Sequence, residues 1–472
     1  MSRTGTVLAV FAWAAGGIAL GQAQPVSPRP IELPPVESGS GPQPVQWTVA
    51  PSPTGGQPAD AAKGAAAPAD PAKAADATAD AAKKEAATLE TLSKTVETLG
   101  KNLTVVTGDE QIKIVLGGTI IADFLYNSRR PVAPGTPFFL TPGPAPGFHE
   151  QTFDASGRQT TLTALVTGPD VCGFQSSAVI AACLYSSSLI EDLWGFLPIQ
   201  AFAQLKNDDW RFAAGLQLDI FNPLNPTVLP ISYLGASGNT GAFRGQARVE
   251  RYLHPSDDSQ ITLTAGLSDP IPTTVSPNFR LSEDNGWPNV EGRAALALGP
   301  VTGEGLAARR PFEVGVSGVV GQIRNTAPFT RQVVADVWGL GTDCRWAITP
   351  RCGVQGELFV GQTLGTYMGG ILQNVNASTF AGLHTSGGWI EFYYYICPEK
   401  LHTHVGYGID DPLDRDLAPG QPVRNDTYFA NLIWNVTKYF QVAEEFTYRK
   451  TAYTVLPNNN GFGFQTQVQF KF

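Results

Sequence analysis

The last residues of the chain alternate between apolar and polar side chains, and this alternation sharply limits the folds open to it. Even positions carry Phe462, Phe464, Thr466, Val468, Phe470 and Phe472, whereas odd positions carry Gly463, Gln465, Gln467, Gln469 and Lys471. A period of two places the two sets on opposite faces of one extended strand. Strands in soluble sheets usually end after about 5–6 residues. An apolar face maintained over about ten residues is typical of strands that cross a membrane.

The same alternation recurs upstream. It is found in residues 210–220, 243–250, 290–298, 312–320 and 428–436. The apolar faces carry aromatic and aliphatic side chains such as Trp210 and Leu432, and the polar faces carry Gln, Arg, Asn and single acids. Water-exposed sheet faces are normally rich in Lys, so these polar faces fit the wall of a water-filled interior better.

The connections between these segments alternate in length. Short turns are expected at 207–209, 254–258, 348–351, 397–400 and 437–438, and long loops at 127–151, 221–240, 269–287, 364–382, 410–425 and 454–460. Outer-membrane barrels have short periplasmic turns and longer outer loops. The pattern therefore predicts an all-β fold, a transmembrane antiparallel β-barrel over residues 110–472. It has about 16 strands, and an even number returns both ends of the barrel to the periplasmic side.

Composition and charge exclude other classes. Only 15% of the residues are charged, there are 50 glycines, and the formal net charge is −9. This is the wrong sign for a nucleic-acid partner, and it is far from the composition of a long coiled coil. After the N-terminus, no run of residues reaches the ~18 apolar positions that a membrane-spanning helix needs.

The first 109 residues are organised differently. Residues 1–23 read as a signal peptide with one early cation, a short apolar stretch and a small-residue cleavage site, although a membrane anchor is the alternative. Residues 24–73 are rich in Pro and Ala, which predicts a disordered spacer. Residues 74–109 predict a periplasmic helix, and leucines spaced three and four apart after Leu89 leave a coiled coil open.

The chain has five cysteines, so at least one has no partner within the chain. Cys344 and Cys352 flank a turn-like run, and a hairpin would bring them face to face, so they are the disulfide candidate in an oxidising compartment. The pairing of Cys172, Cys183 and Cys397 stays open.

Four stretches and the last residue carry a resemblance to a known family. The stretches are 117–123 (GGTIIAD), 219–226 (DIFNPLNP), 361–367 (GQTLGTY) and 406–412 (GYGIDDP), and the chain ends on Phe472. Residues 110–472 resemble the DcaP-type trimeric outer-membrane porins and related, largely uncharacterised bacterial porins. The resemblance implies a 16-stranded barrel in a homotrimer with a periplasmic helical segment. It also implies that Phe470 and Phe472 form an insertion signal for the barrel-insertion machinery.

The inward faces of the expected strands supply the site residues. The pore-lining or constriction candidates are Asp123, Arg211, Gln217, Asp219, Arg244, Gln246, Arg248, Glu250, Glu291, Arg293 and Glu313. In the resembled family, basic residues at the constriction favour anionic solutes, but acids and bases are mixed here. Two interpretations stay open: a field that biases which ions pass, or an ion-pair network that only holds strands together. The run 219–226 begins either an inward-folded loop that narrows the pore or an ordinary outer loop.

The function predicted from the sequence is an outer-membrane porin. It would pass small hydrophilic solutes by passive diffusion with mild charge selectivity, without a cofactor or metal. No G-x-S-x-G or H-E-x-x-H motif points to an enzyme. His402 and His404 share a strand face but lack an obvious third ligand for a metal. The alternatives are a secreted soluble β-rich carbohydrate-binding protein and a barrel-anchored surface enzyme.

Overall fold

The computed structural model describes residues 104–106, 112–144, 149–185, 194–270, 286–302, 309–325 and 333–472. By its internal contacts the chain forms two units, residues 1–25 with 103–472 and residues 26–102. The predicted signal peptide (1–23) and spacer (24–73) lie outside the described residues. Of the predicted helical segment 74–109, only Thr104–Val106 are described, and they form a short strand, β1, beside Lys113–Val115. The helix prediction is therefore wrong for these three residues.

Strands make up nearly all of the regular structure. After β1 they are β2 (Lys113–Asn127), β3 (Thr152–Ser156), β4 (Thr161–Val171), β5 (Phe174–Tyr185), β6 (Trp194–Lys206), β7 (Trp210–Leu218), β8 (Phe243–Ser256), β9 (Ser259–Ser268), β10 (Asn289–Leu298), β11 (Phe312–Asn325), β12 (Val333–Thr349), β13 (Cys352–Gln362), β14 (His384–Cys397), β15 (Leu401–Pro412), β16 (Pro422–Asn435), β17 (Phe440–Tyr453) and β18 (Asn459–Lys471). Three short 3-10 turns are also present among the described residues: η2 (Gly365–Tyr367), η3 (Gly370–Leu372) and η4 (Asp414–Asp416).

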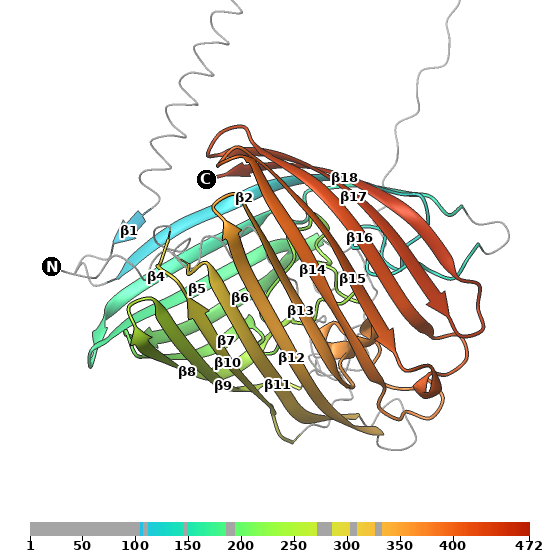
Figure 1. Ribbon diagram of the computed structural model, residues 1–472, viewed down its shortest axis with the longest axis horizontal. Coiled ribbons are helices and arrows are strands. Elements are labelled where there is room, and N and C mark those ends of the chain that lie inside the picture. Colours follow the sequence, from blue (N-terminus) through green and yellow to red (C-terminus); the bar gives the residue numbers. More distant parts are fainter. Residues whose placement is uncertain are drawn as a thin grey trace, which may run out of the picture. The chain divides into compact units, whose positions relative to one another are not determined.

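Each strand pairs antiparallel with the next, and the last strand closes the sheet on the first. β18 pairs with β2 from Lys471–Thr119 to Gly463–Asn127. Both β3 and β4 pair with β2, so they form one strand interrupted at 157–160. The result is a closed antiparallel barrel of 16 strands, as predicted. Figure 1 shows the strands wrapping around the barrel from blue β2 to red β18.

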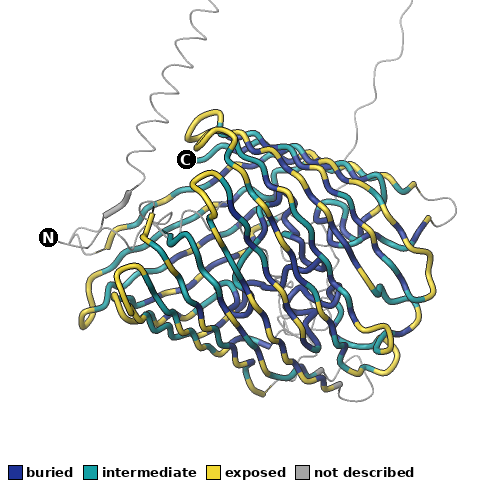
Figure 2. The backbone as a smooth tube through the Cα atoms, in the orientation of Figure 1, coloured by how far each residue is buried: buried dark blue, intermediate teal, exposed yellow. Residues whose placement is uncertain are grey.

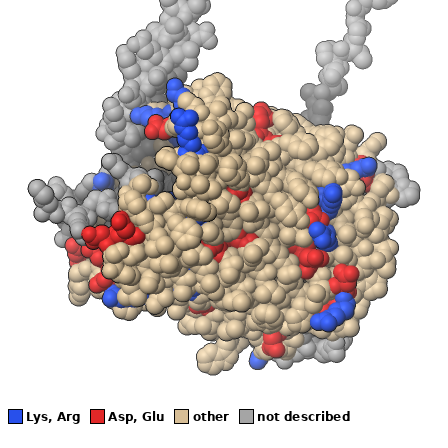
Figure 3. Space-filling model, in the orientation of Figure 1, with Lys and Arg blue, Asp and Glu red and all other residues tan. Residues whose placement is uncertain are grey.

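The predicted division into inner and outer faces is confirmed. On β18, Phe462 and Phe464 are each 45% exposed on the outer surface, whereas the next residue, Gln465, is 2% exposed on the inner side. The outer surfaces of the other strands also expose large apolar side chains, for example Leu358 on β13. In Figure 3, uncharged residues cover most of the visible face. Such a surface is far too apolar for water alone and suits hydrocarbon.

The two ends of the barrel differ in the length of their connections. At one end, called here the turn end, the chain reverses at 172–173, 207–209, 257–258, 350–351, 398–400 and 436–439, and through the longer connection 299–311. The opposite end, the loop end, carries longer connections, which are described in full at 219–242, 363–383, 413–421 and 454–458 and in part at 128–151 and 269–288. The predicted turn at 254–258 is shorter than expected, because β8 continues to Ser256.

No helix among the described residues is both long enough and apolar enough to cross a membrane.

The predicted disulfide between Cys344 and Cys352 is wrong. In the β12–β13 hairpin Cys344 lies opposite Gly356, and Cys352 lies opposite Thr349. Both thiols are free. The hairpin turns tightly at 350–351, so a residue at the start of β13 can pair only with the end of β12.

Candidate functional site: the loop-lined barrel interior

The interior of the barrel is crossed by the loop 219–242, called here the crossing loop. β7 ends at Leu218, opposite the first residue of β8 and well before the loop end of β6, and Pro223, Pro226 and Pro230 then prevent the loop from extending the sheet. Most residues of the crossing loop are buried, and the others are half-buried. Figure 2 shows the buried segments gathered inside the barrel.

The crossing loop is held by carboxyl groups from the inner wall. Their acceptor atoms reach backbone N–H groups of the loop, and each comes from a different strand. Glu291 Oε2 (β10) accepts from Ile220 N at 2.8 Å and Phe221 N at 3.2 Å, Glu357 Oε1 (β13) from Leu224 N at 2.6 Å, Glu391 Oε2 (β14) from Thr227 N at 2.6 Å, and Glu445 Oε2 (β17) from Leu229 N at 2.8 Å.

These bonds have a clear physical reason. A loop inside the barrel takes its backbone N–H groups out of water, and an unpaired buried N–H group costs about 1–3 kcal/mol. The four carboxyl groups are themselves almost fully buried, so each satisfies a donor that water cannot reach. Their order around the barrel follows the order of their partners in the loop, which fixes the path of the loop across the lumen.

Polar side chains complete the anchoring. Ser317 Oγ (β11) accepts from Asn222 N at 3.1 Å, and Asn431 Nδ2 (β16) donates to Thr227 O at 2.6 Å. Near the loop's far end, Asn425 Nδ2 (β16) donates to Ala236 O at 2.8 Å. The crossing loop therefore contacts wall strands from β10 to β17.

Two further loops meet the crossing loop inside the barrel. Residues of 128–144, 219–242 and 363–383 form one apolar cluster: Ala133, Phe138, Ala236, Ala242, Met368, Ile371 and Leu372. A second cluster joins Phe221, Leu364 and Tyr367 to inward-facing wall residues Val319, Ile323, Val337 and Phe359. Part of the barrel interior is thus a dry core, and not the uniformly polar wall that the alternation predicted.

Asp410 on β15 holds the loop 363–383. Its two carboxyl oxygens accept from Gly370 N at 3.0 Å and Ile371 N at 2.8 Å, and Thr385 Oγ1 donates to it at 2.9 Å. Gly370 and Ile371 have φ values of +61° and +53°. Two successive left-handed residues turn both N–H groups toward one acceptor, which explains why a strained Ile is held there.

Arg244 was predicted to line the pore, but the structure places it in a closed contact. Its guanidinium is 1% exposed. It donates to Asp219 Oδ1 at 2.5 Å, Thr366 O at 2.9 Å and Asp269 O at 3.0 Å, and it lies 3.8 Å from the ring centroid of Tyr367. Arg244 and Asp219 therefore tie three loops together and do not face the water-filled space.

Tyr367 extends this contact to the wall. Its hydroxyl donates to Glu291 Oε1 at 3.0 Å. Burial raises the pKa of Tyr367 well above its usual value, despite the nearby Arg244 guanidinium. The hydroxyl thus stays protonated and remains a donor. Glu291, another predicted lining residue, is 1% exposed and acts as an anchor for the loops.

One group of charges that still reach the interior lies on β6–β8. Arg211 forms an ion pair with Glu250 and donates to Gln204 Oε1 at 2.6 Å, and Arg248 Nη1 lies 3.7 Å from Glu250 Oε1. The side chains of Arg211, Arg248 and Glu250 are each 12% exposed. Lys206 Nζ lies 5.1 Å from the ring centroid of Tyr252 on the same wall. Three cations thus face one acid.

The remaining predicted residues are bound in wall networks. Gln217 accepts from Arg211 at 3.2 Å, and Gln246 donates to Gln217 O at 2.9 Å. Arg293 binds Asp343 at 2.5 Å and Glu313 at 3.0 Å, and Arg345 binds Glu313 at 3.0 Å. Asp123 accepts from Gln465 at 2.8 Å and from Gln467 at 2.7 Å across the β2–β18 closure.

Sequence reasoning missed the anchoring acids Glu357, Glu391, Glu445 and Asp410. Their inward position could be read from the alternation of β13, β14, β15 and β17. Their bonds to a loop far away in the sequence carry no local signal. Glu391 Oε1 also lies 2.5 Å from His404 Nδ1, and His404 Nε2 lies 2.8 Å from His402 Nδ1. Within the described residues, no group of three His, Cys, Asp or Glu side chains is arranged to hold a metal ion.

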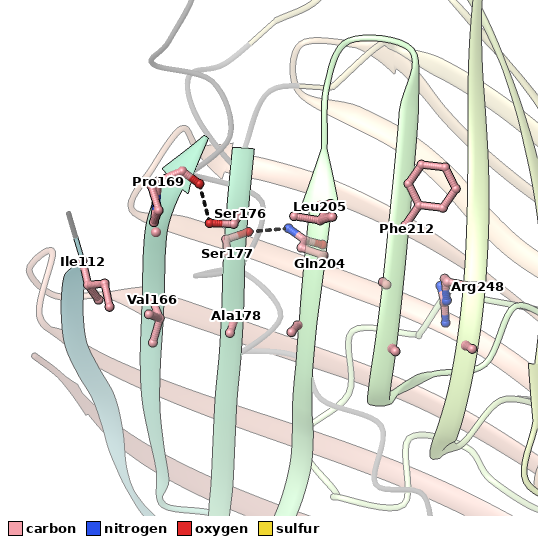
Figure 4. Close-up of a pocket in the computed structure, with 15 residues that line it drawn as sticks. Ile112, Val166, Pro169, Ser176, Ser177, Ala178, Gln204, Leu205, Phe212 and Arg248 are labelled. Atoms are coloured by element: carbon pink, nitrogen blue, oxygen red, sulfur yellow. Dashed lines mark hydrogen bonds between the residues drawn. The ribbon is translucent and has the colours of Figure 1, made fainter. Parts of the chain in front are cut away.

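A separate apolar hollow of about 650 Å³ lies on the outer wall. Ala178, Ala203, Ala214 and Ala247 face outward in register across β5–β8. Larger side chains border this alanine row, and Figure 4 shows Val166, Leu205 and Phe212 among them. The hollow faces away from the lumen and lies outside any solute path.

The closed 16-stranded sheet with loops folded into its interior defines a porin-type barrel. Among solved structures, the chain is similar to the outer-membrane channel DcaP of Acinetobacter baumannii, with a TM-score of 0.59, 14% identity and coverage of 78% of this chain and 99% of that one. It is also similar to Salmonella typhi OmpF in complex with daunomycin, with a TM-score of 0.50, 9% identity and coverage of 78% and 100%. At these identities the similarity confirms the fold that the sequence resemblance implied.

No family model matches the chain, and no curated protein matches it either.

Proposed function

We propose that this protein is an outer-membrane porin that passes small hydrophilic solutes by passive diffusion. The observation that carries this proposal is the crossing loop, bound by acids of four wall strands inside a closed barrel. A fixed loop across the barrel interior narrows the passage and excludes large solutes by size, without a chemical step. The similarity of the fold to that of DcaP, an outer-membrane channel, supports the same assignment.

The outer surface supports placement in an outer membrane. It exposes apolar side chains around the barrel, which disfavours the alternative of a secreted soluble carbohydrate-binding protein. The turn end faces the periplasm and the loop end faces outward, as in other barrels of this kind. The exported N-terminus and the C-terminal Phe470 and Phe472 fit this orientation, with the barrel-insertion machinery as a partner.

The charge balance of the interior supports mild charge selectivity. Lys206, Arg211 and Arg248 face Glu250 on β6–β8, whereas the Arg293 network on β10–β12 is balanced. One wall of the passage is therefore net positive. Because the excess is small and partly buried, a weak preference for anions follows.

The homotrimer is part of the same proposal. The alanine row gives β5–β8 a flat, recessed outer face, which suits close contact between two barrel walls. Native mass spectrometry of protein extracted in mild detergent should give three copies. Replacing Ala203 and Ala214 by Trp should yield monomers, whereas Leu358→Trp on β13 should not. A monomeric wild-type protein would contradict the trimer.

The conducting function is tested with purified protein in planar bilayers. Stepwise, ohmic conductance is expected in neutral salt, and a larger unit conductance is expected after residues 224–236 are replaced by a short Gly-Ser linker. A correctly folded protein that inserts without conducting would refute the proposal. No enzymatic step is proposed for this barrel.

A further inference from the structure

The outer surface changes character at the loop end of β17 and β18. Moving toward that end, successive outward pairs are Phe446 with Phe464, Tyr448 with Phe462, and Lys450 with Asn460. Apolar rings thus give way to a tyrosine and then to polar and cationic groups. In membrane barrels this order marks the level where hydrocarbon ends and lipid headgroups begin.

A polar hollow of about 520 Å³ lies at this level. Its lining includes Arg129, His149, Gln151, Tyr448, Asn460 and Gly461. Tyr448 OH donates to Asn460 Oδ1 at 3.2 Å, which leaves the Asn460 amide N–H groups available to a ligand. The hollow therefore combines hydrogen-bond donors with an aromatic floor at the edge of the apolar band.

Arg129 lines this hollow and can donate hydrogen bonds into it. Its stem lies flat on Gly461, where a Cβ atom would overlap the Arg129 side chain. Within the part of the chain that the structure describes, its guanidinium has no hydrogen bond or ion pair, whereas that of the neighbouring Arg130 donates to His149 O at 3.4 Å. By contrast, Arg424 at the same end is bound to Asp426 at 2.9 and 3.0 Å.

Lys450 lies next to the hollow, beside Asn460. Its Nζ atom is 5.5 Å from the ring centroid of Tyr448 and 5.8 Å from that of Tyr428, and it has no ion pair among the described residues. The acid in the lining, Glu150, accepts instead from the buried Asn459 Nδ2 at 3.1 Å. Arg129 thus remains without a carboxylate partner at headgroup level, whereas Lys450 lies opposite Asp426 of β16, an acid that Arg424 already binds.

We propose that this hollow binds a phosphate group of an outer-leaflet lipid. Arg129 supplies a planar fork of N–H donors that matches phosphate oxygens, and Lys450 supplies a second positive charge. The lipid's acyl chains would then lie along the apolar rings of Phe446, Phe462 and Phe464. This inference depends on the proposed outer-membrane location and not on conduction.

The test measures retention of bis-phosphorylated lipid A by the purified full-length protein, using native mass spectrometry. Wild type should retain the lipid. The double variant Arg129→Gln with Lys450→Gln should bind it at least about tenfold more weakly, because both charged contacts are removed. Gly461→Ala should also weaken binding, because it displaces Arg129 without changing charge. Arg415→Gln, a cation in η4 outside the hollow, is the matched control and should bind as wild type.

Three outcomes would overturn the proposal. Full retention by the double variant would show that these cations do not bind the lipid, and equal retention of dephosphorylated lipid A would show that phosphate is not recognised. If inorganic phosphate bound the hollow with the same affinity as lipid A, the hollow would be a site for free phosphate and not for a lipid. Unit conductance measured on the same samples should be unchanged, so a failure of channel function would be seen separately.

Discussion

Buried acids have an unexpected role at the scale of single residues. The inward acids expected from the sequence were candidates for setting a field in the pore, yet Glu291 is covered by loops. Glu357, Glu391 and Glu445, which were not expected, do the same work of binding backbone N–H groups. A carboxyl group suits this work because its two oxygens can each accept a hydrogen bond.

Glu357→Ala is expected to loosen the crossing loop. It leaves both Leu224 N–H and Trp389 Nε1–H without an acceptor, which costs about 2–3 kcal/mol at buried sites. Hydrogen exchange at the Leu224 amide should accelerate, and open-channel noise should increase. Glu357→Gln keeps one acceptor oxygen, which can satisfy one of the two donors, and should show a smaller effect than the Ala variant. An unchanged Leu224 amide in the Ala variant would contradict the anchoring role.

Arg248→Gln is expected to reduce the anion preference. Removing one unit charge about 8 Å from a passing ion in water changes its energy by ~0.5 kcal/mol, a factor of about two in relative permeability. Reversal potentials in a salt gradient measure this change. Arg244→Gln is the informative comparison: because Arg244 is covered by loops, it should alter channel stability and leave ion preference unchanged. Equal shifts in both variants would refute the distinction between these residues.

At the scale of elements, a short strand and a long loop create the constriction. β7 ends at Leu218, and the crossing loop then runs inward. It passes so close to β14 and β15 that only glycine fits at its contact: Gly238 has φ +101°, and a Cβ atom there would overlap Gly388 O. Close backbone approach is a common reason for glycine at such a point.

Gly238→Ala is expected to displace the tip of the crossing loop from the wall. The substitution combines a left-handed φ with an overlap against β14, so the loop must move or the barrel must deform. Unit conductance should change, and the bond between Ser237 Oγ and Thr427 Oγ1, 2.8 Å in length, should be lost. Gly245→Ala, where the added methyl group meets no atom within 4 Å, should conduct as wild type. Identical conductance in both variants would exclude this close contact.

At the scale of the whole molecule, closure of the barrel depends on the C-terminal strand. Phe472 N and O pair with Gly118 O and N at 3.1 Å each, which fastens the end of β18 to β2. β2 and β18 are far apart in the sequence, and their pairing closes the sheet. Without this pairing, each strand would present an open edge to lipid, and its backbone N–H and C=O groups would lack hydrogen-bond partners.

Deletion of Phe472 is therefore expected to lower the amount of folded barrel in the outer membrane. The loss removes two closing hydrogen bonds and the terminal aromatic residue of the expected insertion signal. Heat-modifiable migration on gels measures the folded fraction in isolated envelopes. Phe472→Tyr keeps both the backbone and a ring and should fold normally. Wild-type amounts of folded protein after the deletion would exclude both roles.

The amino-acid sequence by itself determined the barrel. Strict alternation fixes which side chains face lipid and which face inward, and turn signals set the strand number, because both depend on residues close together in the chain. The run 219–226 also marked the end of a strand, but an inward-folded loop and an ordinary outer loop both stayed open there. These are local properties, so no knowledge of distant contacts was needed.

Only the tertiary structure decided what fills the barrel. Arg244 and Arg248 are both inward cations on one strand, yet loops bury the first and leave the second partly exposed. The disulfide prediction failed because register placed Cys344 opposite Gly356. An inward residue becomes a pore charge or a loop anchor according to which distant loop covers it. That choice depends on the total path of the loops through the lumen, which no local pattern encodes.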